Sequence, residues 1–381
     1  MTGLLSPTSG RSLRADGPDV LTDGAERWPV LDGIPFLRTG REDLVRDVLA
    51  AIDRGDREGA LVRLLVDQDD WWDGAPPAED VLRRLVRERD VLPLRDAMHL
   101  LGLGRVGDYF AHRWSDPTYL AGLALLDAHW SEPADAFELA CGIGHYLRDL
   151  SLRGVEASGA DVVFAKLWLA RHWVVGPDVR LSCFDARSPW PVSGVAFDLV
   201  FCHDAYYFLE PKAEILRNLR GLVRPSGTLA IAHVHNSGAA NLSAGSGISA
   251  REIAATFPDA TVYDDAELTR AAAAGRAPVS QPPESLAEVE AFSLVEGQGS
   301  AARAAAGPLC SPRKGASLRR NPLYTTGAGE GATIRWPSER YRSEYAPGAT
   351  YSLSTSLADK PRRPSLEAFR RREVLDLPER W

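Results

Sequence analysis

The chain has 381 residues, of which 45% are hydrophobic and 25% charged, and its formal net charge is −8. This composition is typical of a globular protein with enough residues for one large domain and a smaller one. The acidic balance and the lack of a long basic run argue against nucleic acid as the main partner. No apolar run is long enough to span a bilayer, and the N-terminus has no apolar signal core, so we expect a cytoplasmic protein with no membrane partner.

Residues 1–40 contain short apolar pieces between Gly, Asp, Ser and Pro, which predicts a small β-rich module. The segment 28–37 resembles the last hairpin of a zinc-ribbon-like module. Such modules usually open with Cys-Pro-x-Cys-Gly, whereas residues 6–10 read Ser-Pro-Thr-Ser-Gly here. Because serine hydroxyls are poor zinc ligands, we expect a ribbon without metal. An irregular N-terminal arm is the alternative, and no metal is expected elsewhere, since the four cysteines are widely spaced.

Residues 41–130 are predicted to be helical. Leu44, Val48 and Ile52 recur every four residues, and Asp116-Pro117 has the form of a helix start. Aromatic residues precede that start, and they either pack between helices or form a cap over an acceptor pocket. We take 41–130 as a helical cap region that extends the main domain at its N-terminal side.

From residue 136 the pattern alternates between strand and helix. Strands are expected at 136–140, 155–160, 179–183, 197–202 and 228–234, and helices lie between them. This alternation predicts an α/β fold with a doubly wound, mostly parallel sheet, in which ligands bind beyond the carboxyl ends of the strands. Two further strands, at 291–296 and 317–324, are expected as an antiparallel hairpin at the sheet edge.

The first of these strands leads into a glycine turn. Glu138 ends the apolar run, Ala140, Gly142 and Gly144 follow at alternate positions, and a helical pattern begins directly afterwards. Glycines allow a ligand to approach the backbone, and the amides that open a helix then face that ligand. The dinucleotide-binding fingerprint needs a small residue at 147, where this chain has Leu, so a dehydrogenase is disfavoured.

This turn resembles motif I of the class I S-adenosylmethionine-dependent methyltransferases, with Ala140 in place of the first glycine. Two later stretches, 196–203 and 222–231, resemble the fourth strand of that family and its Pro-x-Gly turn into the fifth. The resemblance covers about residues 136–236. It implies a Rossmann-like sheet of seven strands and S-adenosylmethionine as the cofactor. Modules like the one expected at 1–40 precede some methyltransferases.

The resemblance also implies roles for acids that follow successive strands. Asp161 would accept hydrogen bonds from the ribose hydroxyls, and Asp185 from the adenine amino group, with Val162 or Phe184 covering the ring. Glu138 would steady the glycine loop or bind the ammonium group. Each acid has a structural alternative: Asp161 as a helix N-cap and Asp185 as a turn residue. The cofactor-binding residues expected are Glu138, Ala140, Gly142, Gly144, Asp161, Val162, Phe184, Asp185 and His203.

A hydroxyl acceptor would need a base, and histidine has the pKa best suited to that task near neutral pH. His203 follows the fourth strand, which in this fold lies beside the glycine loop, and we expect it to be the base. His235 ranks second: strand alternation places it on the same face as His233. Both could instead hydrogen-bond only to backbone.

The function expected is therefore methyl transfer to a small-molecule acceptor, and a non-catalytic cofactor-binding partner or regulatory protein of the same fold is the alternative. The domains expected are the module at 1–40, the cap at 41–130, the methyltransferase domain at 131–330 with insertions in 237–318, and a C-terminal extension at 331–381 packed on it. Neither the methylated atom nor the oligomeric state follows from the sequence.

Overall fold

The structure is a computed structural model, and it describes residues 3–192, 194–241, 245–297, 302–303, 307–325, 333–349 and 365–381. Its central element is a seven-stranded sheet with the order β10-β11-β9-β8-β5-β6-β7. Neighbours from β7 to β9 are parallel, whereas β11 runs antiparallel to both β9 and β10. The strands are β5 (Asp135–Leu139), β6 (Glu156–Asp161), β7 (Arg180–Cys183), β8 (Phe197–His203), β9 (Val223–His235), β10 (Thr261–Asp264) and β11 (Ala291–Gly297).

This sheet confirms the doubly wound, mostly parallel fold expected from the sequence. The prediction of an edge hairpin made of 291–296 and 317–324 is wrong for the second strand. β11 occupies the expected position, but its outer partner is β10, and Arg319–Arg320 (β12) pairs instead with Val374–Leu375 (β15). Pro322 has no N–H group to continue a strand at 317–324. The four residues of β10 are too few to show a period in the sequence.

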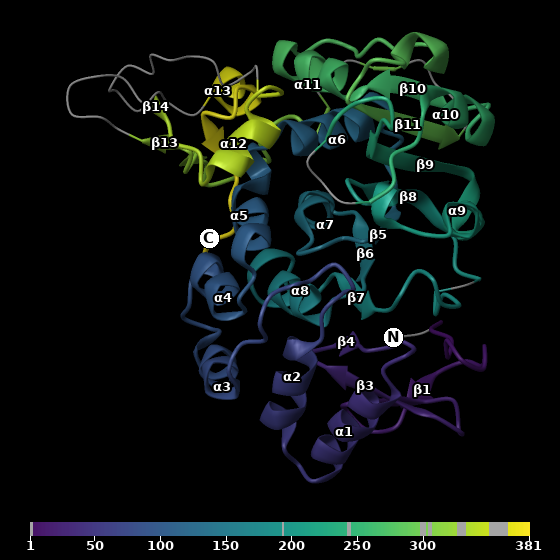
Figure 1. Cartoon of the computed structure of the whole chain (residues 1–381), viewed down its shortest axis with the longest axis vertical. Helices are drawn as coiled ribbons and strands as arrows, with labels where there is room; N and C mark the ends of the chain where they lie inside the picture. The colour runs from purple at the N-terminus through teal and green to yellow at the C-terminus, as the bar shows by residue number, and fades with distance from the viewer. Residues whose placement is uncertain are drawn as a thin grey trace.

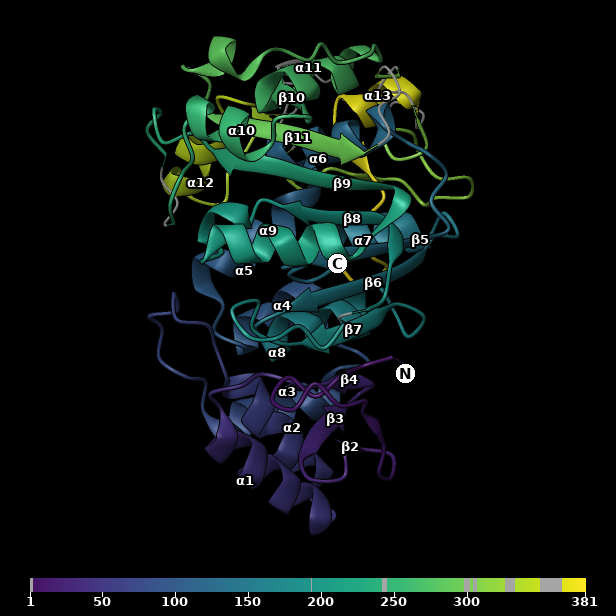
Figure 2. The ribbon, with the colours of Figure 1, turned by 90° about the vertical axis from the view of Figure 1, so that its right-hand side faces the viewer.

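Helices cover both faces of the sheet, as Figure 2 shows. On one face α9 (Lys212–Gly221) and α10 (Ala250–Thr256) pack against apolar side chains of β8, β9 and β11. On the other lie α6 (Pro117–Ala128), α7 (His145–Ser151), α8 (Phe164–Leu169) and α11 (Asp265–Ala274). Every residue of α6 is buried. None of the helices that the structure describes is long and apolar enough to span a bilayer.

The N-terminal strands form a separate four-stranded antiparallel sheet below β7 (Figure 1). They are β1 (Arg14–Ala15), β2 (Val20–Thr22), β3 (Arg27–Leu31) and β4 (Ile34–Pro35). Phe36 forms a parallel bridge with Cys183, and the Leu37 amide donates to the Cys183 carbonyl at 2.7 Å. This segment therefore covers an edge of the main sheet that would otherwise expose unpaired backbone groups.

Hydrogen bonds close the loop at residues 6–10, where a zinc-ribbon-like module would have its first pair of cysteines. The Ser9 hydroxyl and the Arg11 guanidinium both donate to the Asp23 carboxylate, and the Ser9 amide donates to the Ser6 hydroxyl at 3.4 Å. These contacts close the loop with side-chain hydrogen bonds, at a place where zinc ribbons have thiolate ligands. The ribbon itself stays a prediction.

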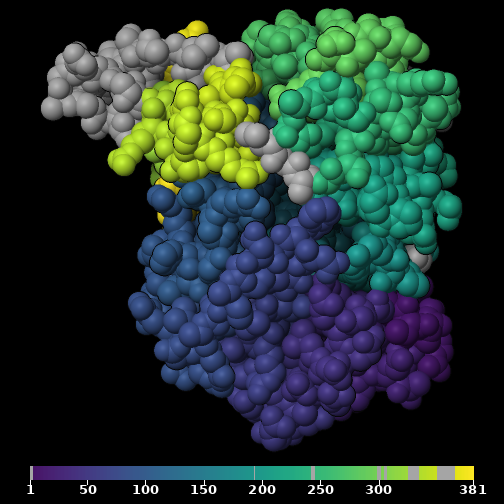
Figure 3. All heavy atoms as spheres, viewed as in Figure 1, coloured from purple at the N-terminus to yellow at the C-terminus, as the bar shows by residue number. Residues whose placement is uncertain are grey.

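The remaining helices connect the N-terminal sheet to the main domain and close the chain. The first group is α1 (Glu42–Asp53), α2 (Arg57–Val66), α3 (Glu79–Glu88), α4 (Leu94–Leu100) and α5 (Gly104–His112). The C-terminal part has β13 (Tyr324–Thr325), β14 (Thr333–Ile334), α12 (Glu339–Tyr345) and α13 (Leu366–Arg370). Short helical turns lie at 113–115, 170–174, 206–208 and 283–286. Figure 3 shows the N-terminal half below and the C-terminal segment at the upper left.

Candidate functional site

The loop between β5 and α7 is bent by three residues with left-handed backbone. Ala140, Gly142 and Gly144 have φ values of 58°, 55° and 81°. Glycine adopts this conformation without a steric cost, whereas alanine does not. The loop is covered by α5: a Cβ atom added at Gly142 would lie 3.0 Å from the Phe110 ring. The Phe110 carbonyl is also 2.9 Å from His145 Nε2, so the cap is attached to the helix that follows the loop.

Asp161 ties this loop to the neighbouring strand. One oxygen of its buried carboxylate accepts from the Gly142 amide at 3.0 Å, and the other accepts from the Val163 amide at 3.0 Å. Lys166 Nζ lies 3.8 Å from it. The structure thus brings Asp161 to the glycine loop; the N-cap of α8 (Phe164–Leu169) is Val163, without a side-chain cap bond, so Asp161 is not the N-cap of that helix.

Glu138 ends β5 on the same side of the sheet. Its side chain is buried, and within the described residues no partner lies within hydrogen-bonding distance of Oε2. Burial raises the pKa of this carboxyl well above its usual range; Arg113 opposes the shift and Asp161 adds to it. A buried polar atom without a partner is costly, so this oxygen is suited to a donor that the chain does not supply.

The residues expected around the adenine lie farther along the same edge. Asp185 is bonded to Arg187 at 2.7 Å, and although burial opposes it, this partner lowers the pKa of Asp185. Phe184 lies in the core, with its ring 5.8 Å from that of Trp190. The Val162 carbonyl accepts from Arg38 of the N-terminal segment at 3.4 Å. The Phe184 ring is thus packed against another side chain, whereas the Val162 contact involves only its backbone carbonyl.

A second polar group lies beyond the ends of β8 and β9. Asp204 directly follows β8, and its oxygen Oδ2 accepts from Arg113 Nη1 and from the Tyr109 hydroxyl, both at 2.8 Å. The Tyr207 hydroxyl donates to Oδ1 at 2.8 Å. Burial would raise the pKa of Asp204, but Arg113 and the neighbouring histidines hold it below its usual range. Asp204 is therefore a buried carboxylate anion.

His233 lies between two carboxylates. Its Nδ1 is 2.9 Å from Asp265 Oδ2, its Nε2 is 3.9 Å from Asp204 Oδ1, and the Ser293 hydroxyl donates to Asp265 Oδ1 at 2.6 Å. Although burial opposes the charged form, the two carboxylates raise the pKa of His233 to about 9. The imidazole is therefore protonated at neutral pH.

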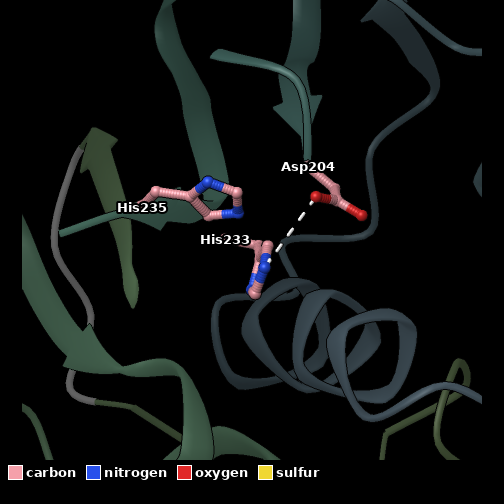
Figure 4. A group of neighbouring side chains, drawn as sticks. All are labelled: Asp204, His233 and His235. Atoms are coloured by element: carbon pink, nitrogen blue, oxygen red, sulfur yellow. Dashed lines mark ion pairs between the residues drawn. The ribbon is translucent and has the colours of Figure 1, made fainter. Parts of the chain in front are cut away.

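A bulge at the end of β9 turns two histidines to one side. His233 has φ 53°, and the pairing of β11 with β9 shifts register at Ser293. Such a bulge re-aims side chains, so His233 and His235 lie together with ring centroids 5.0 Å apart, as Figure 4 shows. The His235 ring stacks on Tyr207 at 3.7 Å, and burial together with the His233 charge lowers the pKa of His235 to about 4.

His203 lies apart from this group. Its ring points to the α6 face of the sheet and is 4.6 Å from the Tyr146 ring. Neither ring nitrogen has a partner within the described residues, and burial lowers its pKa to about 3. Like Glu138, His203 thus has buried polar atoms at the end of a strand that form no hydrogen bond with the described residues.

Sequence reasoning did not assign roles to Tyr109, Arg113, Asp204 or Asp265. Asp204 could have been found, because it directly follows a strand that was expected. Arg113 and Asp265 give no local signal, since each meets this edge only through the fold.

Residues 137–231 match the model of a methyltransferase domain family. The match runs from β5 into β9 and includes the glycine loop, Glu138 and Asp161. This central part of the chain is thus similar to a methyltransferase domain, and domains of the matched family bind S-adenosylmethionine, the cofactor expected from the sequence. A search of curated proteins found no match.

Two solved structures illustrate the likeness. The amino pentose methyltransferase CalS10 of Micromonospora echinaspora is 29% identical over 32% of this chain and 52% of that one, with a TM-score of 0.27. Phosphoethanolamine N-methyltransferase 2 of Haemonchus contortus is 18% identical over 47% of this chain and 49% of that one, with a TM-score of 0.38. The chain thus spans about half of each. At these scores neither says what this chain methylates.

Proposed function

We propose that this protein is a cytoplasmic enzyme that transfers the methyl group of S-adenosylmethionine to a small-molecule acceptor. The observation that carries this proposal is the unpartnered Glu138 oxygen, buried beside a glycine loop that Asp161 holds in place. The cofactor's ammonium group supplies the donor that this oxygen lacks, and the loop amides face its carboxylate.

We place the other cofactor contacts at the carboxyl ends of the neighbouring parallel strands. The Asp161 oxygens each accept one backbone bond and keep lone pairs for the ribose hydroxyls. Asp185 accepts from the adenine amino group, beside Val162 and Phe184. His203, whose neutral ring nitrogens have no partner among the described residues, is placed at the methionine end. Ala140 and the two loop glycines contribute backbone only.

The acceptor meets the methyl group at the ends of β8 and β9. Methyl transfer requires the acceptor atom in line with the methyl–sulfur bond and little water nearby. Phe110 covers the loop, and Tyr345 of α12 stacks on Tyr109 of α5 at 6.3 Å. An edge enclosed in this way suits a small acceptor better than a macromolecule.

A hydroxyl acceptor must also lose a proton. The candidate bases are His235 and His203, whose pKa values burial lowers to about 4 and about 3, so both are neutral near pH 7 but weaker bases than a free imidazole. We place His235 first, because it lies in the polar group with Asp204, whereas His203 is enclosed by α6 and Tyr146.

Calorimetric binding of S-adenosylhomocysteine tests the cofactor site. Gly142→Val should weaken binding at least tenfold, because the side chain meets Phe110 and blocks backbone approach. Gly176→Val is the matched control: Gly176 also has left-handed backbone (φ 73°), but nothing lies within 4 Å of its added Cβ. Equal affinities in the two variants would contradict the site.

Transfer of tritiated methyl groups from S-adenosylmethionine to extracted metabolites tests the reaction. We expect labelled product with the wild type and none with Gly142→Val. Tight cofactor binding without label in any acceptor pool would favour the non-catalytic partner instead.

A further inference from the structure

We propose that Asp204, His233 and His235 bind one divalent first-row transition metal ion at the acceptor edge. This inference rests on the proposed function only for the role of the metal, not for its binding. One ligand atom from each of the three residues lies within 4.8 Å of the other two, and the side chains of His235 and His233 face Asp204 in Figure 4. Asp204 follows β8, and both histidines lie in the last three residues of β9, the strand parallel to β8.

The spacing is close to what a metal needs. Nitrogen and oxygen ligands bind such ions at about 2.1 Å, so two ligand atoms lie at most about 4.2 Å apart. His233 Nε2 and Asp204 Oδ1 are 3.9 Å apart. Around a tetrahedral ion such ligand atoms lie about 3.4 Å apart, so the widest pair, at 4.8 Å or less, must close by up to about 1.4 Å, a distance that side-chain rotation can supply.

Each ligand is oriented by a second residue. Nδ1 of His233 is held by Asp265, which leaves Nε2 toward the centre of the group, and Ser293 holds Asp265 in turn. A carboxylate behind a histidine is the arrangement that orients metal-binding imidazoles in proteins. Tyr207 stacks on His235 and donates to Asp204. The ligands are therefore positioned before any ion binds.

The charges also fit an added cation. Arg113 and Tyr109 both bond Asp204 through Oδ2, so Oδ1 faces the histidines. A metal ion would replace the proton between His233 and Asp204, and the second carboxylate, Asp265, remains nearby to balance it. Asp204 and His233 both have left-handed backbone, with φ 53°. Strain of this kind in residues other than glycine often accompanies function.

The ligand types select the class of ion. Two imidazoles and one carboxylate suit zinc, manganese, iron, cobalt or nickel, whereas calcium and magnesium prefer sites made of oxygen atoms. Three protein ligands leave positions open for an acceptor oxygen.

A metal-bound hydroxyl loses its proton to water more readily. The resulting oxygen anion then forms a bond to the methyl carbon while the methyl–sulfur bond breaks, and the sulfonium becomes a neutral thioether. In the metal-loaded protein His235 is a ligand, and the metal takes over the task of the base.

The test measures metal binding without cofactor or acceptor. The full chain is stripped with chelator and titrated with Co²⁺, followed by visible absorption, and bound Zn²⁺ is counted by elemental analysis. We expect one equivalent of each, with at least tenfold weaker Co²⁺ binding in His235→Ala. His99→Ala, which removes an exposed histidine, should bind as the wild type does. Mg²⁺ and Ca²⁺ should not compete at equal concentration.

Two outcomes would overturn the site: no bound equivalent in the wild type, or unchanged Co²⁺ affinity in His235→Ala. If His235→Ala loses its circular dichroism, His235→Gln, which keeps a side chain of similar size, replaces it. Asp265→Asn keeps all three ligands but alters their orientation, and it should weaken Co²⁺ binding about tenfold or more. Binding of S-adenosylhomocysteine is measured separately, so a failed metal site and a failed methyl-donor site are distinguishable.

Discussion

The two sides of the proposed site are stabilised by different kinds of interaction. On the cofactor side, at β5 and β6, Asp161 accepts from backbone amides, and one Glu138 oxygen has no partner in the part of the chain that the structure describes. On the acceptor side, at β8 and β9, charged side chains bond one another, from Arg113 through Asp204 to His233. The cofactor side thus has a buried oxygen that a ligand can bond, whereas the charges of the acceptor side already neutralise one another. Substitutions should therefore affect binding on one side and folding stability on the other.

The largest difference should come from Asp204→Asn. It leaves the Arg113 guanidinium, only 3% exposed, without its anion. Loss of one partner of a buried ion pair costs about 3–5 kcal/mol. Urea denaturation should show that loss in the free energy of unfolding. Asp53→Asn, which removes an exposed pair with Arg27, should change it little. Equal effects of the two substitutions would mean that the acceptor side is not held by its charges.

Acid should destabilise the fold, because the buried His145 becomes charged more easily in the unfolded chain. Burial lowers the pKa of His145 to about 3, with the Phe110 carbonyl opposing the shift. A group with a lowered folded-state pKa stabilises the fold above its unfolded pKa of about 6.5, and this contribution is lost as the pH falls toward 3. Between pH 6.5 and 5 the loss is about 2 kcal/mol, at 1.36 kcal/mol per unit.

The measurement is the free energy of unfolding against pH. His145→Gln should flatten the acid slope, and His99→Gln, at an exposed position, should leave it unchanged. An unaltered slope in His145→Gln would mean that burial of His145 does not cause the loss of stability in acid.

On the cofactor side, Asp161→Ala should mainly reduce affinity. It removes two backbone contacts that shape the loop and the acceptor for the ribose. The expected loss is roughly tenfold in Kd for S-adenosylhomocysteine, or about 1.4 kcal/mol, the scale of one hydrogen bond to a charged group. Cobalt binding at the acceptor side should not change. Loss of both would show that the edges do not act separately.

The smallest effect is expected at Ala140, which stands in place of the first glycine of the motif. Its φ of 58° is strained for alanine, so Ala140→Gly should raise the free energy of unfolding by up to about 1 kcal/mol. Ala157→Gly, within β6, should lower it by a similar amount, because glycine weakens a strand. Thermal denaturation of the two variants measures the sign, and the same sign for both would contradict the strain.

The two edges also differ in how far the sequence predicts them. The cofactor side follows from one short stretch, in which Glu138 and the glycines lie within seven residues. The acceptor side joins Arg113 to Asp204 across 91 residues and His233 to Asp265 across 32 residues, contacts that no local pattern indicates. His233 and His235 were expected on one face by alternation, but a bulge with left-handed backbone produces that arrangement.

The other differences have local causes. Phe184 stays a prediction for the adenine side; its ring packs against Trp190, a contact that position in the sequence does not reveal. His203 was ranked before His235 from its position after β8. The enclosure of its ring by α6 depends on packing, which position in the sequence does not reveal.

A crystal structure with S-adenosylhomocysteine tests the central claim most directly, that the two edges hold the donor and the acceptor respectively. We expect the ammonium group hydrogen-bonded to Glu138, the ribose hydroxyls at Asp161, and the sulfur facing the space beside Asp204 and His235. A ligand bound elsewhere, or one whose sulfur points away from β8 and β9, would contradict the account.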